Sequence, residues 1–448
     1  MVIGMRHKEA AKSVILTLLV LMSIVLTYLM WNFSPDLANL ESQDNKKDTQ
    51  NTIGKANSES MESVITPYQV VISDSDQSEG ALETRHMNRK IVKVLKNQEI
   101  KNANEVYHAH NLFIPELSDH FLVLDFSYDM PLSMYLGQVL NMDAKVSNKF
   151  NFNRLIIDAD QKNTAVIYAI GSDHHHVMRM NTSISSKNVK DLEDKIQPDL
   201  SPFADIITNK NTIDASTHIF APEKPKHLKT YRTIFNHISV EAMNSILFND
   251  SVMVRSTKSG STTYNNNTGV ASYDSKNESY RYTNLSEDES KSKNMLETIP
   301  STFDYINAHG GFTDDFRLFD TDETSGELTY QSFLNGVPVF NKNNLSTIQV
   351  AWGEKGIFSY ARALLKTNIT IDSDEDKKDL PGAETVRSNL ANNPNIDFKK
   401  VTNMTIGYTM KDKEKDDIEV QRNSEYEPEW YIQYDGEWHA YSNGGLEE

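Results

Sequence analysis

The sequence predicts an α+β protein, in which an N-terminal transmembrane helix precedes a multi-domain extracellular region of mostly antiparallel sheets with helices. Three observations lead to this fold class. The chain has 448 residues, more than one compact core usually holds. Residues 13–33 contain no charged side chain. Elsewhere, short segments of alternating apolar residues are separated by turn residues, a pattern that predicts strands joined by hairpins.

The predicted organisation has six consecutive parts. They are a cytoplasmic tail (1–12), a transmembrane helix (13–33), a flexible linker (34–65), an N-terminal α+β domain (66–200), a central β-rich domain (201–285) and a C-terminal α+β domain (286–448). The linker assignment rests on its polar composition, because a segment with so few apolar and aromatic residues buries too little surface to order itself.

The uncharged run 13–33 has the length of a membrane span, which needs about 20 residues. A signal peptide has a shorter apolar region, about 7–15 residues, and ends at small residues. This run ends in aromatic residues that include Tyr28 and Trp31, which suits the membrane interface. Basic residues precede it and favour a cytoplasmic N-terminus: Arg6, Lys8 and Lys12. We therefore expect an uncleaved signal anchor in the cell membrane with the bulk of the chain outside; a cleaved signal peptide is the alternative.

One stripe of the predicted span has the spacing of a helix–helix contact. Small hydroxyl residues four positions apart let two membrane helices approach closely. We hypothesise that this stripe packs on another membrane helix; it consists of Thr17, Val20, Ile24, Thr27 and Trp31. The alternative, of equal weight, is that the hydroxyls bond their own backbone one turn back.

Composition excludes several classes of function. The chain carries 45 basic and 63 acidic side chains, a net charge of −18, which repels phosphates and argues against nucleic-acid binding. It contains no cysteine, which excludes disulfides, zinc–thiolate sites and thiol nucleophiles. No cofactor is expected.

In the N-terminal domain, residues 121–128 (FLVLDFSY) predict a buried strand that presents alternate apolar residues to one face. Asp129 is the expected N-cap of a following helix, with Pro131 in its first turn. Residues 154–170 predict a hairpin across DADQKN.

In the central and C-terminal domains, Ser239 is the expected cap of a short helix, and SVMVRS predicts a strand after it. Ser286 and Glu289 form a capping box for a helix that runs to Pro300, and a second turn of helix is expected after it, up to Gly310-Gly311. Strands are then expected at ELTYQSFL, VPVF, TIQVAWG and IFSYARALL, with GEKG as a tight turn, and a helix near 384–390. Asp-Gly at 435–436 predicts a final hairpin.

The search for chemistry assigns no catalytic residue and no metal ligand. The three consecutive histidines at 174–176 cannot all face one metal ion, and we interpret them, like His108 and His110, as part of solvated turns. The segment 320–331 (DTDETSGELTYQ) fails as an EF-hand because Ser325 and Gln331 stand where Gly and Glu are required, so an acidic turn is expected.

Aromatic residues near the C-terminus admit two interpretations. Trp352, Trp430 and Trp438 alternate with polar residues along predicted strands. Such residues more often belong to a core than to an exposed binding face, and we expect a core.

Several long segments together resemble one family. They include KSVILTLLVLMSIVLTYLMWNFSPDL, YDMPLSMYLGQVLNM, LKTYRTIFNHISVEAMNSILF, GELTYQSFLNGVPVF, IQVAWGEKGIFSYARALLKT and EWYIQYDGEWHAY. The chain resembles the YycH proteins of low-GC Gram-positive bacteria over essentially its full length, most closely the staphylococcal ones.

This resemblance implies a membrane-anchored, non-enzymatic accessory protein of the WalK–WalR two-component system, which controls cell-wall metabolism. It implies two partners, a YycI-like protein and a WalK-like histidine kinase, contacted through transmembrane helices and extracellular domains. It also implies that the C-terminal domain resembles YycI. Regulation in the family is inhibitory in bacilli and activating in staphylococci, so the staphylococcal likeness favours activation.

Two other functions remain as alternatives from the residues alone. One is a tethered extracellular enzyme that acts on the cell wall, and the other is a wall-binding module. A kinase regulator requires its own membrane span, whereas both alternatives tolerate any anchor.

Overall fold

The computed structural model describes residues 16, 19–23, 52–74, 77–107, 117–160, 163–171, 176–207, 218–248, 252–256, 260–288, 294–412 and 422–447, with backbone alone at 373–376 and 412. The chain divides into two compact units, residues 1–50 and 51–448. In the first unit, residues 19–23 are helical and exposed. The second unit, residues 51–448, is the folded body.

The first lobe of the body contains a sheet of nine strands in the order β3-β7-β6-β5-β4-β1-β2-β8-β9, in which neighbouring strands are antiparallel. The strands are β1 (Gln69–Asp74), β2 (Gln77–Ala81), β3 (Ile100–Tyr107), β4 (His120–Pro131), β5 (Asn151–Asp158), β6 (Thr164–Ile170), β7 (His176–Ser185), β8 (Ser201–Ile207) and β9 (His218–Pro222).

Strand β4 confirms the predicted buried strand and corrects the residues that follow it. Leu122, Leu124 and Phe126 alternate on one face and are buried in the main core. Asp129 does not cap a helix, because β4 continues to Pro131 through a bulge that lets Met130 and Pro131 pair with β5. Helix α4 (Leu132–Met134) starts only there, and a π-helical turn, η1 (Tyr135–Val139), follows it. The predicted hairpin at 154–170 is confirmed by β5 and β6.

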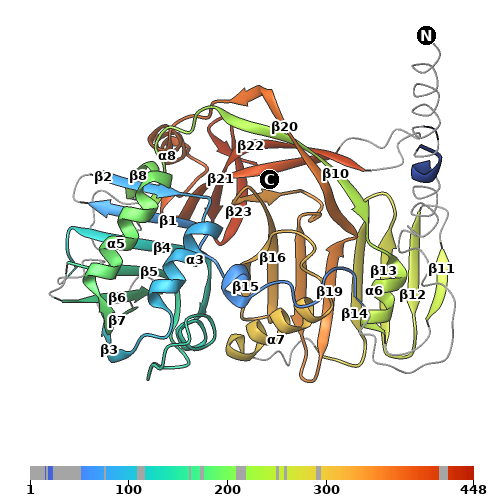
Figure 1. Ribbon diagram of the computed structural model, residues 1–448, viewed down its shortest axis with the longest axis horizontal. Helices are drawn as coiled ribbons and strands as arrows, with labels where there is room; N and C mark the ends of the chain where they lie inside the picture. The colour runs from blue at the N-terminus through green and yellow to red at the C-terminus, as the bar shows by residue number, and fades with distance from the viewer. Residues whose placement is uncertain are drawn as a thin grey trace, which may run out of the picture. The chain divides into compact units, whose positions relative to one another are not determined.

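Two helices cover one face of the first sheet (Figure 1). They are α3 (Arg85–Leu95) and α5 (Ser186–Ile196), and α5 continues into the 3₁₀ turn η2 (Gln197–Asp199). A short helix, α2 (Met61–Val64), packs against α3 and η1. Apolar residues at helical spacing on α3 and α5, such as Ile91, Leu95 and Leu192, are buried in the main core.

The second lobe contains a sheet of fifteen strands, and its longest path is β11-β12-β13-β14-β19-β18-β16-β17-β21-β22-β10-β20. Its pairs are antiparallel except β17–β21. The strands are β10 (Leu228–His237), β11 (Met253–Ser256), β12 (Ser261–Asn265), β13 (Gly269–Asp274), β14 (Ser279–Asn284), β15 (Phe316–Asp322), β16 (Glu327–Leu334), β17 (Val337–Phe340), β18 (Thr347–Trp352), β19 (Ile357–Ala363), β20 (Leu365–Lys378), β21 (Val401–Asp412), β22 (Asn423–Tyr434), β23 (Glu437–Ser442) and β24 (Gly445–Leu446).

The second lobe also carries α6 (Val240–Leu247), α7 (Met295–Ala308), α8 (Ala383–Asn392) and the 3₁₀ turn η5 (Phe398–Lys400). Ser239 caps α6 as predicted, because its hydroxyl accepts the Ala242 N–H at 3.3 Å. The capping box at Ser286 is wrong: Ser286 lies in a turn, and α7 begins at Met295 with Asn294 as its cap. Helix α7 runs unbroken through Pro300 to Ala308, so the helical turns expected before and after this proline form one helix.

The tight turns that the sequence predicts are present. Gly353 N donates to Gly356 O at 2.8 Å between β18 and β19, which closes the GEKG turn. Asp435 and Gly436 have φ of 56° and 91° between β22 and β23, as a two-residue type I′ hairpin requires.

Segment 201–285, predicted as a central domain, is divided between the two sheets. Its first strands, β8 and β9, extend the sheet of the first lobe beyond β2, whereas β10 to β14 belong to the second sheet. The largest buried cluster contains Leu124 and Leu95 of the first lobe together with Ile299 and Tyr330 of the second. The two lobes therefore share one continuous apolar core.

Candidate functional site

The first described segment of the body, residues 52–66, lies along the C-terminal end of α7. Ile53 N donates to His309 O at 3.0 Å, and Asn57 N donates to Asn307 O at 2.8 Å. At the same place Gly54 and Gly310 are in backbone contact: a Cβ on Gly310 would lie 2.4 Å from the Gly54 carbonyl oxygen, and Gly310 has φ of +66°. Glycine is required there both for space and for conformation.

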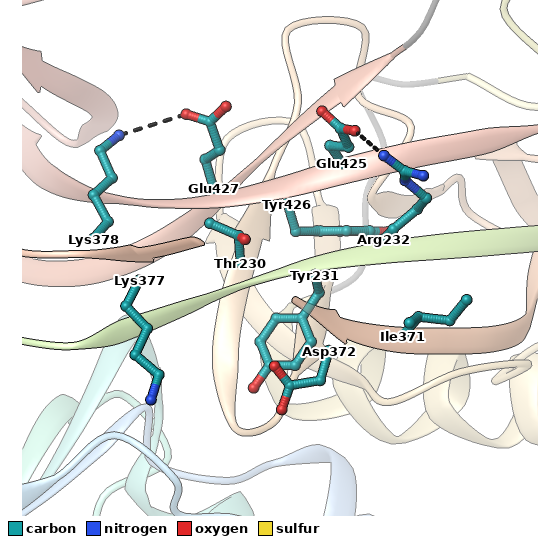
Figure 2. Close-up of a pocket in the computed structure, with 10 residues that line it drawn as sticks. All are labelled: Thr230, Tyr231, Arg232, Ile371, Asp372, Lys377, Lys378, Glu425, Tyr426 and Glu427. Atoms are coloured by element: carbon teal, nitrogen blue, oxygen red, sulfur yellow. Dashed lines mark hydrogen bonds and ion pairs between the residues drawn. The ribbon is translucent and has the colours of Figure 1, made fainter. Parts of the chain in front are cut away.

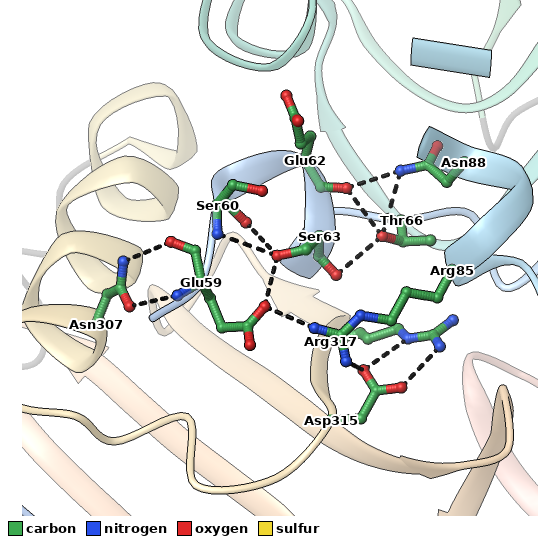
Figure 3. A network of polar contacts seen from close by, with 10 residues as sticks. All are labelled: Glu59, Ser60, Glu62, Ser63, Thr66, Arg85, Asn88, Asn307, Asp315 and Arg317. Atoms are coloured by element: carbon green, nitrogen blue, oxygen red, sulfur yellow. Dashed lines mark hydrogen bonds and ion pairs between the residues drawn. The ribbon is translucent and has the colours of Figure 1, made fainter. Parts of the chain in front are cut away.

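The Asn307 side chain completes this attachment. Its amide donates to Glu59 O at 2.8 Å, and its carbonyl oxygen accepts the Glu59 N–H at 3.2 Å (Figure 3). Asn307 is buried, so the amide replaces the hydrogen bonds that water would make. Helix α7 thus holds the entering segment through both polar groups of one residue.

The Glu59 carboxylate then connects this segment to the first lobe. It accepts from Ser63 Oγ at 2.7 Å and from Arg85 Nη2 of α3 at 2.7 Å. Arg85 Nη1 also lies 3.2 Å from Asp315 Oδ1, just before β15. Asp315 in turn accepts two bonds from Arg317, at 3.1 and 2.9 Å (Figure 3). We call Glu59, Arg85, Asn307, Asp315 and Arg317 the clasp.

Arg317 is the buried anchor of the clasp, with a relative exposure of 0%. Besides Asp315, its Nη1 donates to Thr84 Oγ1 at 3.0 Å at the start of α3, and its guanidinium lies 4.3 Å from the Phe333 ring centroid. A buried cation is tolerated only when it is paired and hydrogen-bonded. These three contacts meet that requirement with groups from both lobes.

The clasp is suited to mechanical coupling rather than to a reaction. It joins segment 52–66 to helix α7 through neutral amide hydrogen bonds, and to helix α3 and the start of β15 through charge-assisted bonds. Displacement of residues 52–66 must therefore break bonds to both lobes. In the chain this segment lies shortly after residues 1–50.

A second candidate surface is an open hollow of about 570 Å³ on β10, β20 and β22. Ion pairs cross it, Arg232–Glu425 at 2.7 Å and Lys378–Glu427 at 3.5 Å (Figure 2). Tyr231 and Tyr426 also line it, and both rings pack edge-on against Tyr408, whose pKa burial raises well above its ordinary value. This mixed charge suits a polar protein segment better than a small apolar ligand.

The proposed transmembrane packing face lies mostly outside the described residues. Of its five members only Val20 is described, in a helical stretch with 51% of its surface exposed; Thr17, Ile24, Thr27 and Trp31 are not. Within the part of the chain that is described, no helix is both long and apolar enough to cross a bilayer.

The histidine and acidic motifs behave as ordinary surface features where they are described. His174, His175, His108 and His110 lie outside the described residues. His176 does not lie in a turn as predicted: it begins strand β7, and its Nε2 lies 4.0 Å from a Glu105 oxygen. Among the described side chains, no group of three His, Asp or Glu has the geometry of a metal site.

The acidic segment 320–331 forms the β15–β16 hairpin. Asp322 accepts from Thr324 N at 2.7 Å and from Ser325 Oγ at 2.8 Å, and these bonds lower its pKa. Burial raises the pKa of the nearby Asp320 carboxyl. The predicted acidic turn is confirmed.

The tryptophans belong to cores, as expected. Trp430 is 1% exposed and donates to Pro381 O at 2.8 Å. Trp438 packs against Tyr68 and Phe340, and Trp352 donates to Thr302 Oγ1 at 2.6 Å beside the main core.

The clasp was missed from the sequence. Residues 52–65 fall in the predicted linker 34–65, yet they are bound to α7 and form α2. The stretch is mostly polar and is held by hydrogen bonds, but its last apolar residues, Val64 and Ile65, are buried in the main core. The one usable sequence signal was Gly310-Gly311, which marked a close backbone approach without identifying its partner.

Two family models match the chain. The model described as "YycH protein, N-terminal domain" matches residues 9–199, and the one described as "YycH protein, C-terminal domain" matches residues 216–444.

Individual proteins agree with the family models. A Bacillus subtilis (strain 168) protein named "Two-component system WalR/WalK regulatory protein YycH" is 21% identical over 460 residues, covering 96% of this chain and 95% of its own. The crystal structure of YycH from Bacillus subtilis superposes with a TM-score of 0.67 at 15% identity, covering 87% of this chain and 98% of that one. The latter likeness shows a shared fold.

Proposed function

The chain belongs to the YycH family, and on this basis we propose that it is an accessory regulatory protein of a WalK-type sensor histidine kinase. The observation that carries the proposal is the match to both family domains, together with an alignment over nearly the whole of both chains to a relative named as a WalR/WalK regulatory protein. No catalytic residue is assigned.

The proposed mechanism places residues 13–33 in the membrane, where Thr17, Val20, Ile24, Thr27 and Trp31 contact a neighbouring helix. An accessory helix that binds two kinase conformations with unequal affinity shifts their populations. A difference of about 1–3 kcal/mol changes the active fraction several-fold or more. The clasp then holds residues 52–66, where the chain enters the extracellular body, to both lobes.

The finer parts of the proposal follow from the family resemblance. The protein acts together with a YycI-like partner, its C-terminal domain resembles that partner, and it activates the kinase and so the control of cell-wall metabolism. Both partners are contacted through the membrane span and the extracellular domains.

The decisive experiment exchanges residues 13–33 for an unrelated apolar helix of the same length. We expect the exchanged protein to remain in the membrane and to lose its effect on phosphorylation of the response regulator in cells. The matched control scrambles residues 36–50, outside both the span and the clasp, and should keep the effect. Full regulation by the exchanged protein contradicts the proposal, since any anchor would then suffice.

A further inference from the structure

Helix α3 concentrates positive charge on a strongly acidic chain. It contains four Lys or Arg residues and no Asp or Glu, although the whole chain carries a net charge of −18. Among the α-helices that the structure describes, no other has a net positive charge, because the three lysines of α5 are balanced by three carboxylates. Like charges three or four residues apart destabilise a helix. The charge of α3 therefore has a cost in the folded protein, which a negatively charged partner would remove.

The cations of α3 form one row on its solvent side. Arg89, Lys90, Lys93 and the C-cap Lys96 lie on the arc of the helix opposite the buried Ile91, and we call these four residues the basic face. Arg89 and Lys93 are one turn apart and exposed. Within the part of the chain that the structure describes, neither of these two side chains has an ion pair or a hydrogen bond.

Neighbouring carboxylates compensate only the other two cations of the row. Lys90 Nζ lies 3.5 Å from Asp199 Oδ2, and Lys96 Nζ lies 2.6 Å from Glu62 Oε2. The side chains of the two lysines keep relative exposures of 30% and 40%, so both remain at the surface. The charges of the two unpaired residues remain as the net positive charge of the basic face.

The basic face lies beside the segment by which the chain enters the body. Glu62, the partner of Lys96, belongs to α2, and Arg85 at the start of α3 pairs with Glu59 of the clasp. Residues 34–51 separate this segment from the predicted span 13–33, and a chain of that length reaches at most about 65 Å when fully extended. With residues 13–33 in the membrane, the membrane surface therefore always lies within that distance of the entry to the body.

We propose that the basic face of α3 docks on the anionic outer surface of the membrane that holds residues 13–33. The inference rests on the proposed function for the placement of that span. Lys and Arg donate charge-assisted hydrogen bonds to phosphate, and clusters of basic residues on a helix near a membrane span are attracted to anionic lipid. The membrane is the one polyanion to which the chain is covalently held close, so weak attraction suffices for docking.

Docking through this face would also orient the body. The rest of the body is acidic, so anionic lipid repels it while attracting α3. The same contact brings the neighbouring segment 52–66 and the clasp toward the membrane surface, because the ion pairs of Glu59 and Glu62 join that segment to α3.

The absence of cysteine from the native chain allows one fluorophore to be placed on the basic face through His86→Cys, at an exposed position. The full-length chain would be reconstituted into vesicles of phosphatidylcholine alone or of an equal mixture with phosphatidylglycerol, at a dilution at which copies do not share a vesicle. A lipid with a nitroxide on its headgroup quenches the fluorophore only near the membrane surface. Flotation of the chain with the neutral vesicles reports separately on the span.

We expect stronger quenching in the anionic vesicles than in the neutral ones, and loss of the difference at about 1 M salt, where the Debye length is about 3 Å. Arg89→Gln combined with Lys93→Gln should lower the ratio of docked to undocked protein about tenfold or more, since each cation near an anionic surface favours docking about fivefold. The control, Lys355→Gln combined with Lys399→Gln, removes the same charge from exposed lysines of the second lobe and should leave the quenching unchanged.

Equal quenching in the two kinds of vesicle, with the chain floating in both, would overturn the docking and leave the proposed function standing. A chain that does not float with the neutral vesicles would contradict the span and, with it, both proposals. Unchanged quenching after the two substitutions on α3, or an equal loss in the control, would overturn the basic face as the docking site. Protection of position 86 by an acidic protein in cells, without any dependence on lipid charge in vesicles, would assign the face to that protein and overturn the membrane contact.

Discussion

Removing the carboxylate of Asp315 tests whether Arg317 is the anchor that the clasp requires. Arg317 is 0% exposed, and Asp315 is its partner in an ion pair with two hydrogen bonds. Leaving a buried charge without its partner costs 3–5 kcal/mol. Asp315 retains 21% side-chain exposure, so water partly replaces it, and we expect Asp315→Ala to lower the free energy of unfolding by about 3 kcal/mol.

The assay is urea unfolding of the purified protein, compared with two further variants. Arg85→Gln removes partly exposed contacts of the same cluster and should lower the free energy of unfolding by about 1 kcal/mol or less. Asp315→Ala combined with Arg317→Met removes both charges and should recover at least about half of the loss. The reasoning fails if Asp315→Ala changes the free energy of unfolding by less than about 0.5 kcal/mol, or if the double variant is less stable than the single one.

Three further outcomes are expected from unfolding measurements. Gly310→Ala should lower the free energy of unfolding by about 2 kcal/mol or more, because the added Cβ would meet the Gly54 carbonyl. Gly436 also has a positive φ but has open space around it, so Gly436→Ala should lower it by about 1 kcal/mol. Trp430→Ala should cost about 3–5 kcal/mol by emptying a buried site. Burial raises the pKa of the Glu193 carboxyl, so the folded protein binds the proton of this group more tightly than the unfolded chain does. The free energy of unfolding should therefore fall as pH rises through the folded-state pKa. Glu193→Gln should flatten this fall and leave the free energy of unfolding at low pH almost unchanged. Equal losses of stability for the two glycine variants would contradict the steric argument, and an unchanged stability of Trp430→Ala would contradict its burial. An unchanged pH profile of stability in Glu193→Gln would contradict the argument from the raised pKa.

Local patterns predicted the parts of the fold that local physics controls. Alternation identified the strand at 121–128, and Asp435-Gly436 identified the last hairpin, because both depend on residues close in the chain. The start of α7 was mispredicted because Ser286 and Asn294 are both good caps. Burial of Met295 in the main core places the helix start at Asn294, and this tertiary contact leaves no mark in the cap sequence.

The clasp could not be predicted from the sequence because its partners are far apart in the chain. The bonds between Glu59 and Asn307 join residues separated by 248 positions, and those between Thr84 and Arg317 join residues separated by 233. Single polar residues have no periodicity that points to their partners. The same composition that makes a segment look like a linker also makes it able to bind through hydrogen bonds, so polarity alone cannot distinguish a free tether from an attached one.

The strength of the clasp bears on how a signal would reach the body. Its outer contacts, such as Glu59–Arg85, are partly exposed and individually worth about 1 kcal/mol or less, whereas Arg317 is buried and costly to expose. Breaking these outer contacts alone therefore takes an energy comparable to the roughly 1–3 kcal/mol of typical allosteric coupling. The buried Arg317–Asp315 pair stays intact, and Val64 and Ile65 of the same segment stay buried in the core common to both lobes. Loosening of the outer contacts thus changes how the entering segment is held without unfolding either lobe, which is the property that a reversible regulatory junction requires.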